Sequence, residues 1–515
     1  MTHPTRRSVL VGGGAAVAAS LTAEGTWSLR SASAANLTRF DANSAQGKAM
    51  LKIYAGAVGK MMDLADTQPG NPLSWLFQWY THGVKQPWQQ PISVSFKQPE
   101  IDRIYTNASD PNRALATTMW DTCTHYGQPE MYFLPWHRMY VYFFEQIIRS
   151  ISGEAQFTLP YWDYTNPARH ALPPEFMMPN DPVFKPLFRS QRKPGVNNGQ
   201  PIDAGRPPFL NLNDMKFATY LPSGPGGFCS SLDRNLHGNV HVNVGTQPPA
   251  SDLGMTFVPT AANDPIFWLH HCNIDRIWAS WNKEGGANPD DGTFKGMPFT
   301  FSDVNGKAVQ TKVGDVLDTQ QLNYVYDDYL QRPPGSDPFQ PGITLSSEAF
   351  SLHADTVPVS GPISLRTQPV TATLALRSVP ELAGPQGSAE LSVQLSNALN
   401  NRNLYVVLNK VQVSRQYPGA AYSVYLNVPP GTKPALDDPG YVGTLNFFSL
   451  HGEHADHDGA PTVAFPATDA LKTVRKQRGA VAETTVTLVP EGEIAPEAEA
   501  RIGSISLVSR QTGRS

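Results

Sequence analysis

The stretch 264-DPIFWLHHCNIDRIW-278 places two adjacent histidines, His270 and His271, inside an apolar run. Asp264 and Pro265 are typical of a helix start, because a short acidic side chain can cap the first turn and proline is tolerated there. At helical spacing, one face of this helix carries Phe267, His271, Asp275 and Trp278. A buried imidazole costs free energy unless its nitrogens have partners. The stretch therefore predicts a buried helix whose inward histidine binds something.

Three more segments place histidines beside aromatic residues at helical spacing. They are 71-NPLSWLFQWYTHG-83, 134-LPWHRMYVYFFEQIIRSISG-153 and 236-LHGNVH-241. His237 and His241 stand four residues apart, the spacing that lets one helix offer two imidazoles to one metal ion. A single buried histidine is common in protein cores, but four helices that all turn histidines inward indicate a metal site built from neutral imidazole. Copper, zinc and iron all accept such ligands, so spacing alone leaves the metal open.

The composition is that of an ordinary globular protein rather than a nucleic-acid or membrane protein. The chain has 515 residues, a net charge of −4, 40% hydrophobic and 16% charged residues, and no basic block. This length exceeds what one core usually supports, so two domains are expected. Only three cysteines are present, too few for a disulfide framework. We expect no nucleic-acid partner and no membrane partner.

The N-terminal segment is typical of a targeting signal. The stretch 5-TRRSVLVGGGAAVAAS-20 pairs two arginines with a short apolar run, and 32-ASAA-35 follows as a small-residue cleavage site. The run is too short and too glycine-rich to span a bilayer. Residues 1–34 are therefore predicted to be a twin-arginine signal peptide, and the mature protein is predicted to be periplasmic or secreted.

The composition and the hydrophobic periodicity of the sequence change near residue 332. Residues 35–331 contain helical patterns separated by long loops, and 332-RPPGSDPFQPG-342 is typical of a linker. Short β-branched, partly alternating segments follow, such as 404-LYVVLNKVQVS-414. We predict a mainly α domain over 35–331, a Pro-rich linker over 332–358 and an all-β, sandwich-like domain over 359–515.

Several of these motifs, in this order, resemble one known family. The segments are THG at 81–83, CTHYGQPEMYFLPWHR at 123–138, HGNVH at 237–241 and NDPIFWLHHCNIDRIW at 263–278. Together they resemble the type-3 binuclear copper proteins, which include tyrosinases, catechol oxidases and haemocyanins. VLDTQQLNYVYDDY at 316–329 and YVGTLNFF at 441–448 are similar to the corresponding parts of plant polyphenol oxidases. The resemblance implies a four-helix bundle around two copper ions.

The resemblance also assigns the metal ligands. His82, His125 and His137 match the ligands of the first copper, and His237, His241 and His271 match those of the second. His270 is then structural. In most relatives the last two ligands of the first copper stand nine apart, whereas His125 and His137 stand twelve apart. Phe267 is expected to pack on the imidazoles, and Asp275 to accept a hydrogen bond from a ligand N–H.

Three further positions carry expectations from the same resemblance. CTH at 123–125 is similar to relatives in which the cysteine is bonded to the histidine ring, so Cys123 is a predicted thioether partner of His125. An inert core cysteine is the alternative. Asp233, four residues before His237, is the predicted proton acceptor, with a capping or surface acid as the alternative. Gly238 stands where relatives that hydroxylate monophenols often carry asparagine, although Asn239 follows it.

The family implies an oxidoreductase that uses two copper ions and dioxygen to oxidise o-diphenols to o-quinones, with monophenol hydroxylation as a possible second activity. The small-molecule partner is a phenol, and the oligomeric state is left open. An o-aminophenol oxidase would carry the same six histidines. A haemocyanin-like oxygen carrier and a copper storage protein are the alternatives from other functional classes.

The C-terminal domain contains no catalytic motif, and its resemblance to the tail of latent plant enzymes implies a cover over the copper site. Tyr422, Tyr425, Phe447 and Phe448 are the predicted contact residues. The segment 451-HGEHADHDG-459 carries three histidines in a polar stretch. It is predicted to be either an exposed loop or a patch that collects copper for loading.

Overall fold

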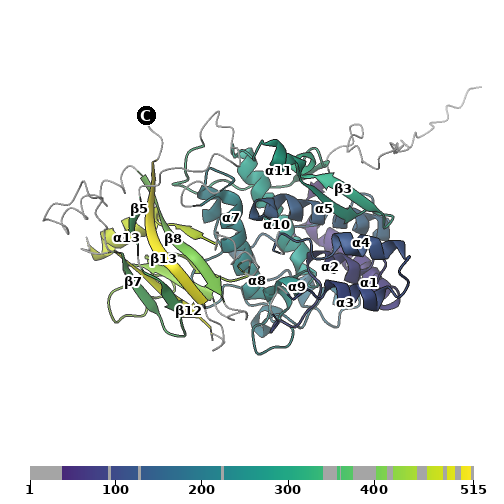
Figure 1. Ribbon diagram of the computed structural model, residues 1–515, viewed down its shortest axis with the longest axis horizontal. Coiled ribbons are helices and arrows are strands. Elements are labelled where there is room, and N and C mark those ends of the chain that lie inside the picture. Colours follow the sequence, from purple (N-terminus) through teal and green to yellow (C-terminus); the bar gives the residue numbers. More distant parts are fainter. Residues whose placement is uncertain are drawn as a thin grey trace, which may run out of the picture.

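The computed structural model consists of a helical part followed by a β-rich part, as the sequence predicts (Figure 1). The described residues are 37–90, 94–125, 129–221, 226–339, 356–359, 361–374, 402–413, 421–448, 450, 461–479, 484–492 and 500–511. The predicted signal peptide and the segment 451–459 lie outside them. No helix among these residues is long and apolar enough to cross a membrane.

The helical part is built around four elements that surround one interior. These are α2 (Trp75–His82), α5 (Phe133–Ser152), α8 (Gly238–Val244) and α10 (Ile266–Lys283). The other helices of this part are α1 (Ala45–Thr67), α3 (Lys97–Ile104), α4 (Pro111–Met119), α6 (Pro194–Asn197), α7 (Phe228–Leu232), α9 (Val258–Ala261) and α11 (Gly292–Gly296). Long loops join them, as the composition of this region predicts.

The ends of the central helices follow from their local sequence. Ser74 caps α2 by accepting a hydrogen bond from the Phe77 backbone, and α5 ends at Gly153, which has φ of 76°. At the start of α10, Asp264 accepts a hydrogen bond from the Ile266 backbone N–H at 3.1 Å. These short-range contacts fix where each helix begins, and so which residues its buried face presents.

One irregular element interrupts the helix that carries His237. The segment η6 (Asp233–His237) is a π-helix that joins α7 to α8. In a π-helix the hydrogen bonds join residues five positions apart rather than four, and such turns are frequent at functional sites. The carbonyls of Arg234 and Asn235 accept hydrogen bonds from the side-chain amide of Asn446, which belongs to the β-rich part.

Two antiparallel sheets form the C-terminal part. One has the strand order β10-β9-β12-β7 and the other β11-β8-β13-β5, with β6 also paired to β13. Their bounds are β5 (Thr356–Val359), β6 (Ile363–Leu365), β7 (Val370–Leu374), β8 (Arg402–Val413), β9 (Ala421–Leu426), β10 (Tyr441–Leu445), β11 (Val463–Pro466), β12 (Thr484–Glu491) and β13 (Ala500–Gln511). Among the described residues of this part there is one helix, α13 (Thr468–Arg478). The alternation in the sequence therefore predicted the sandwich-like class correctly.

Short strands also occur in the helical part. β2 (Pro298–Ser302) pairs with β3 (Ala308–Lys312) in an antiparallel hairpin. β1 (Leu37–Arg39) pairs in parallel with β4 (Tyr324–Tyr326), so two segments far apart in sequence lie side by side.

A buried ion cluster joins β1, β4, α5 and α10. Arg39 contacts Glu145 at 2.8 Å and Asp275 at 3.1 Å, and Arg138 also contacts Asp275. Asp275 in addition accepts hydrogen bonds from the hydroxyls of Tyr324 and Tyr326 at 2.6 and 2.5 Å. Burial alone would raise the pKa of Asp275, but Arg138 and Arg39 hold it below its ordinary value.

Replacing Asp275 by asparagine is expected to lower the free energy of unfolding by about 3 kcal/mol or more, because the buried Arg138 loses its carboxylate partner and Arg39 keeps only Glu145. Since the pKa of Asp275 is depressed, the stabilisation is present above the unfolded pKa, near 4, and is lost as pH falls below it. The measurement is urea unfolding at pH 7. The control is Asp102→Asn, which removes a carboxylate paired with Arg113 at the surface and should change little. Equal midpoints for the two variants would contradict the expectation.

Candidate metal centre

The helical part brings six histidines into its interior. His82 ends α2, His137 lies in α5, His237 ends the π-helix, and His241 and His271 lie in α8 and α10. His125 lies in the loop between α4 and α5. Each side chain is buried; His125 is the most exposed at 6%.

These histidines form two triangles that face each other. In the first, the ring centres of His82, His125 and His137 are 5.7 to 6.2 Å apart. In the second, those of His237, His241 and His271 are 4.6 to 5.7 Å apart. His137 and His271 connect the two sets, since their rings stack at 4.3 Å with an interplanar angle of 11°.

Four of the rings are oriented by backbone carbonyls through their Nδ1 atoms. The acceptors are Val258 O for His82 at 3.0 Å, Phe133 O for His137 at 2.8 Å, Asp233 O for His237 at 3.1 Å and Met255 O for His241 at 2.9 Å. A carbonyl can only accept, so Nδ1 carries the proton and the Nε2 lone pair is left for another partner. This is the arrangement that orients metal-ligating imidazoles in proteins.

The remaining nitrogens fit a metal ion. Nε2 of His82, His237, His241 and His271 is buried without a hydrogen-bond partner. Burial lowers the pKa of His137 to about 4 and that of His241 and His271 well below the ordinary value, and neighbouring imidazoles lower the last two further. Buried polar nitrogens without partners are costly, whereas neutral imidazoles are good ligands for copper. The second triangle therefore fits a metal ion with nitrogen ligands, and the first offers the free Nε2 of His82 beside His125 and His137, whose Nε2 atoms contact Asp233 and Cys123.

Asp233 lies between the two triangles. Its Oδ1 atom is 3.1 Å from Nε2 of His125 and 3.0 Å from Nδ1 of His237. Burial alone would raise the pKa of Asp233, but the two imidazoles hold it well below the ordinary range, so the carboxylate is ionised. The sequence placed this acid near the second triangle, and the structure places it against a member of each.

Glu130 is an acid near this site that the sequence analysis did not select. Its Oε2 atom contacts Arg234 at 2.7 Å, and burial raises its pKa to about 7. The only sequence signal was its place in the segment between His125 and His137.

Phe267 takes the position predicted for it. Its ring centre is 4.2 Å from that of His271 and 4.8 Å from that of His82. The prediction for Asp275 is wrong, because its hydrogen bonds run to two arginines and two tyrosines and not to an imidazole.

His270 lies closer to the second triangle than its structural role implied. Its Nδ1 is 2.9 Å from the hydroxyl of Tyr164, while its ring stacks on that of His237 at 5.2 Å. The nitrogens of His237, His241, His270 and His271 approach one another within 4.8 Å. The structure therefore offers a fourth imidazole beside the three predicted ones.

Cys123 is buried beside the first triangle. Its Sγ atom is 3.3 Å from Nδ1 of His125 and 3.6 Å from Nε2 of His137. The other cysteines, Cys229 and Cys272, are also buried and free. Cys123 is thus the thiol that contacts the predicted ligands.

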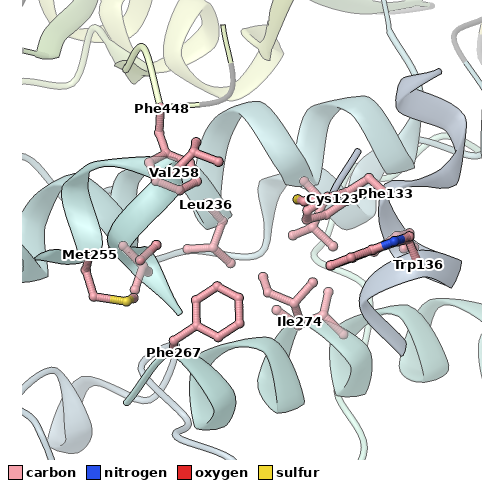
Figure 2. Close-up of a cluster of buried hydrophobic side chains, with 14 of the residues drawn as sticks. Cys123, Phe133, Trp136, Leu236, Met255, Val258, Phe267, Ile274 and Phe448 are labelled. Carbon is pink, nitrogen blue, oxygen red and sulfur yellow. The ribbon is translucent and has the colours of Figure 1, made fainter. Parts of the chain in front are cut away.

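A phenylalanine from the C-terminal part packs against the histidines. Phe448 stacks on His241 with ring centres 3.9 Å apart and an angle of 12°, and lies 5.5 Å from His237 and 5.7 Å from His125. Figure 2 shows Phe448 entering from the C-terminal part, while Phe267 points from α10 on the opposite side. Of the four predicted contact residues, Phe448 is the one that contacts the histidines.

Gly238, the residue after His237, lies against Asn446 of the C-terminal part. A Cβ atom built on Gly238 would lie 2.9 Å from Cγ of Asn446 and nearer still to its Oδ1. The side chain of Asn239 donates a hydrogen bond to the carbonyl of Thr444 at 2.9 Å. The glycine that departs from the relatives therefore makes room for Asn446, two residues before Phe448.

Comparisons with known proteins agree with this site. The common central domain of tyrosinase matches residues 72–200 and 216–284, and the polyphenol oxidase middle domain matches residues 296–333. A domain of unknown function (DUF7868) matches residues 358–510. Together these matches cover both the helical and the β-rich parts.

Among curated relatives, Tyrosinase HcTyr1 of Hahella sp. (strain CCB-MM4) is 32% identical over 307 residues, 54% of this chain and 60% of that protein. The chloroplastic polyphenol oxidase of Malus domestica is 32% identical over 224 residues, 38% of this chain and 37% of that protein. The chain thus spans less than two thirds of the length of these relatives.

Solved structures match nearly the whole chain. Latent aurone synthase, a polyphenol oxidase, covers 94% of this chain and 91% of its own at 19% identity, with a TM-score of 0.61. Latent apple tyrosinase covers 94% of this chain and 99% of its own at 23% identity, with a TM-score of 0.60. At such identities the likeness concerns the fold, including the C-terminal part. The matches to the common central domain of tyrosinase and to the polyphenol oxidase middle domain place the helical part of the chain in the tyrosinase and polyphenol oxidase family, and the C-terminal part shares the fold of the latent polyphenol oxidases.

Proposed function

We propose that this protein oxidises o-diphenols to o-quinones with dioxygen, using two copper ions held by His82, His125 and His137 and by His237, His241 and His271. The observation that carries the proposal is the pair of facing triangles, in which His82, His237 and His241 are fixed through Nδ1 and keep Nε2 without a protein partner. Two copper ions held there would supply the one-electron redox steps that couple phenol oxidation to dioxygen reduction.

The protein's own groups prepare this chemistry. Phe267 and Phe133 pack on the imidazoles and keep water out, which strengthens electrostatic interactions at the site. Asp233 is the ionised carboxylate in contact with both triangles, so its Oδ1 is the atom placed to accept a proton from a phenolic hydroxyl.

We further propose that the C-terminal domain is a cover that limits access to the site. The stacking of Phe448 on His241 supports this, as do the contacts of Asn446 with the π-helix and of Asn239 with Thr444. In this arrangement the side chain of Asn239 is hydrogen-bonded to Thr444 of the C-terminal domain, and Gly238 has no side chain, so neither residue supplies the free asparagine found in relatives that hydroxylate monophenols. Monophenol hydroxylation is therefore expected to be weak beside diphenol oxidation.

The test is a comparison of initial rates for a catechol, a monophenol and an o-aminophenol, using the copper-loaded full chain before and after mild detergent treatment. The catechol should be oxidised fastest, with accumulation of coloured quinone and a higher rate after treatment. A faster reaction with the o-aminophenol would assign the protein to that substrate class. Reversible oxygen binding without product from any substrate would overturn the enzyme proposal.

We propose that residues 1–34 direct twin-arginine export and that the mature protein acts outside the cytoplasm. The paired arginines at 6 and 7 and the short apolar run support this. Several relatives are named as chloroplastic plant enzymes, so the cellular destination proposed for this protein differs from theirs. Replacement of Arg6 and Arg7 by lysine should leave the folded protein in the cytoplasm, as cell fractionation would measure.

A thioether between Cys123 and His125 is a further expectation. Its formation joins Sγ to the ring carbon beside Nδ1, with loss of the thiol hydrogen and the ring hydrogen in a two-electron oxidation by dioxygen. The 3.3 Å approach of Sγ to Nδ1 favours it. Peptide mass mapping of copper-matured protein should show residues 123–125 lighter by two hydrogens, and the difference should vanish in Cys123→Ser. A Cys123 that alkylating reagents still modify in active enzyme would contradict this, and Cys229→Ser serves as the matched control.

A further inference from the structure

A second cavity lies away from the histidines, between the loop 193–206 and the chain that leaves α8. Its volume is about 590 Å³, which is in the range of small-molecule sites. The polar side chains lining it include Lys193, Gln200, Arg206, Asn243, Thr246 and Gln247. None of its lining residues is acidic, although two are cationic.

The positive charge in this cavity is only partly compensated. Nζ of Lys193 donates to the neutral amide oxygen of Asn243 at 3.2 Å, and no ion pair of Lys193 is found among the described residues. Arg206 is paired with Glu491 of β12 at 2.8 Å, and that carboxylate is shared with Ser423 and Thr444. Two like charges in a half-buried space repel each other, and an anion between them would relieve this repulsion.

The apolar part of the lining indicates what kind of anion fits. The lining also includes six apolar residues: Pro194, Val196, Pro201, Ile202, Pro249 and Ala250. An inorganic anion would leave that surface in contact with water, whereas an organic acid would cover it. We propose that the cavity binds a small organic carboxylate, whose acid group contacts Lys193 and Arg206 and whose apolar body packs on the prolines.

The titration of Lys193 gives this proposal an independent readout. Burial and then Arg206 lower the pKa of Lys193 to about 7, whereas Glu491 raises it. A bound carboxylate would favour the ammonium form, so binding near neutral pH should take up protons. Calorimetry in two buffers of different ionisation enthalpy measures that uptake directly.

The experiment uses the copper-loaded full chain and cyclohexanecarboxylate, which has no phenolic hydroxyl and cannot be oxidised. Binding is expected, with proton uptake, and should weaken at least about tenfold in Lys193→Met and in Arg206→Gln, since each removes a charge-assisted hydrogen bond. Lys307→Met, in the exposed β2–β3 turn, is the matched control and should bind as the parent does.

Three outcomes would overturn the proposal. Equal affinity for the uncharged amide cyclohexanecarboxamide would mean that the cavity does not select a charge. Tighter binding of inorganic phosphate than of the carboxylate would exclude an organic ligand class. Binding that is unchanged in both Lys193→Met and Arg206→Gln would place the ligand elsewhere. None of these results depends on catechol oxidation, so they are separate from the test of the proposed function.

Discussion

Replacing His271 by alanine is expected to remove one of two copper ions and to reduce catechol oxidation to background. His271 stacks on His137 of the other triangle and has both ring nitrogens without protein partners, so its loss affects both halves of the site. The remaining imidazoles of the second triangle, His237 and His241, would leave the ion with too few ligands. Copper per chain and the initial catechol rate are the two measurements.

The matched control is its neighbour, His270→Ala. His270 is equally buried and its Nε2 also lacks a hydrogen-bond partner, but the family resemblance assigns the ligand to His271, so we expect two copper ions and most of the activity to remain. The reverse result, with copper lost in His270→Ala and kept in His271→Ala, would show that the wrong member of the pair was assigned as the ligand.

Replacing Phe448 by alanine is expected to raise the catechol rate of the untreated protein by about tenfold or more. The ring covers His241 at 3.9 Å, and burial of a phenylalanine side chain contributes about 2 kcal/mol, so its removal shifts the balance toward the open form. Copper content should not change, because Phe448 supplies no ligand. The rate is compared with and without detergent, and the two values should converge in the variant.

Leu436→Ala is the control for this experiment, since Leu436 is an apolar side chain of the same domain that is 50% exposed. It should remain as latent as the parent protein. The contrary result is an untreated Phe448→Ala variant that oxidises catechol no faster than the parent but is still activated by detergent. The cover would then act through contacts other than this ring, such as that of Asn446 with the π-helix.

The helices and their inward faces could be predicted because the information is local. A 3.6-residue period fixes the faces of α5 and α10, Gly153 ends α5, and Asp264 and Pro265 precede α10; together these features fix the direction of His137 and His271. Alternating strands predicted the C-terminal class in the same way. The resemblance to the copper family then selected six histidines, and the structure brings all six together.

The errors and omissions concern partners that lie far away in sequence. Asp275 shares the stripe of His271, but the stripe does not show that Arg39, 236 positions away, would bind its carboxylate. Phe448 could not be separated from Tyr422, Tyr425 and Phe447, because only the docking of the β-rich part decides which aromatic ring meets His241. The π-helix that ends at His237 is too short to leave a recognisable periodic pattern in the sequence, so it was not predicted.

The parallel pairing of β1 with β4 has a consequence for how such a chain can be cut and recombined. Leu37–Arg39 is fastened to Tyr324–Tyr326, and Arg39 lies over the ring of Tyr324 at 3.8 Å. The two ends of the histidine-bearing part are therefore joined by backbone pairing. Cleavage of the chain after Tyr326 would leave this pairing intact, whereas removal of residues 37–39 would break it. The segment that follows Tyr326 could accordingly be exchanged or lost in evolution while the pairing of β1 with β4 is kept.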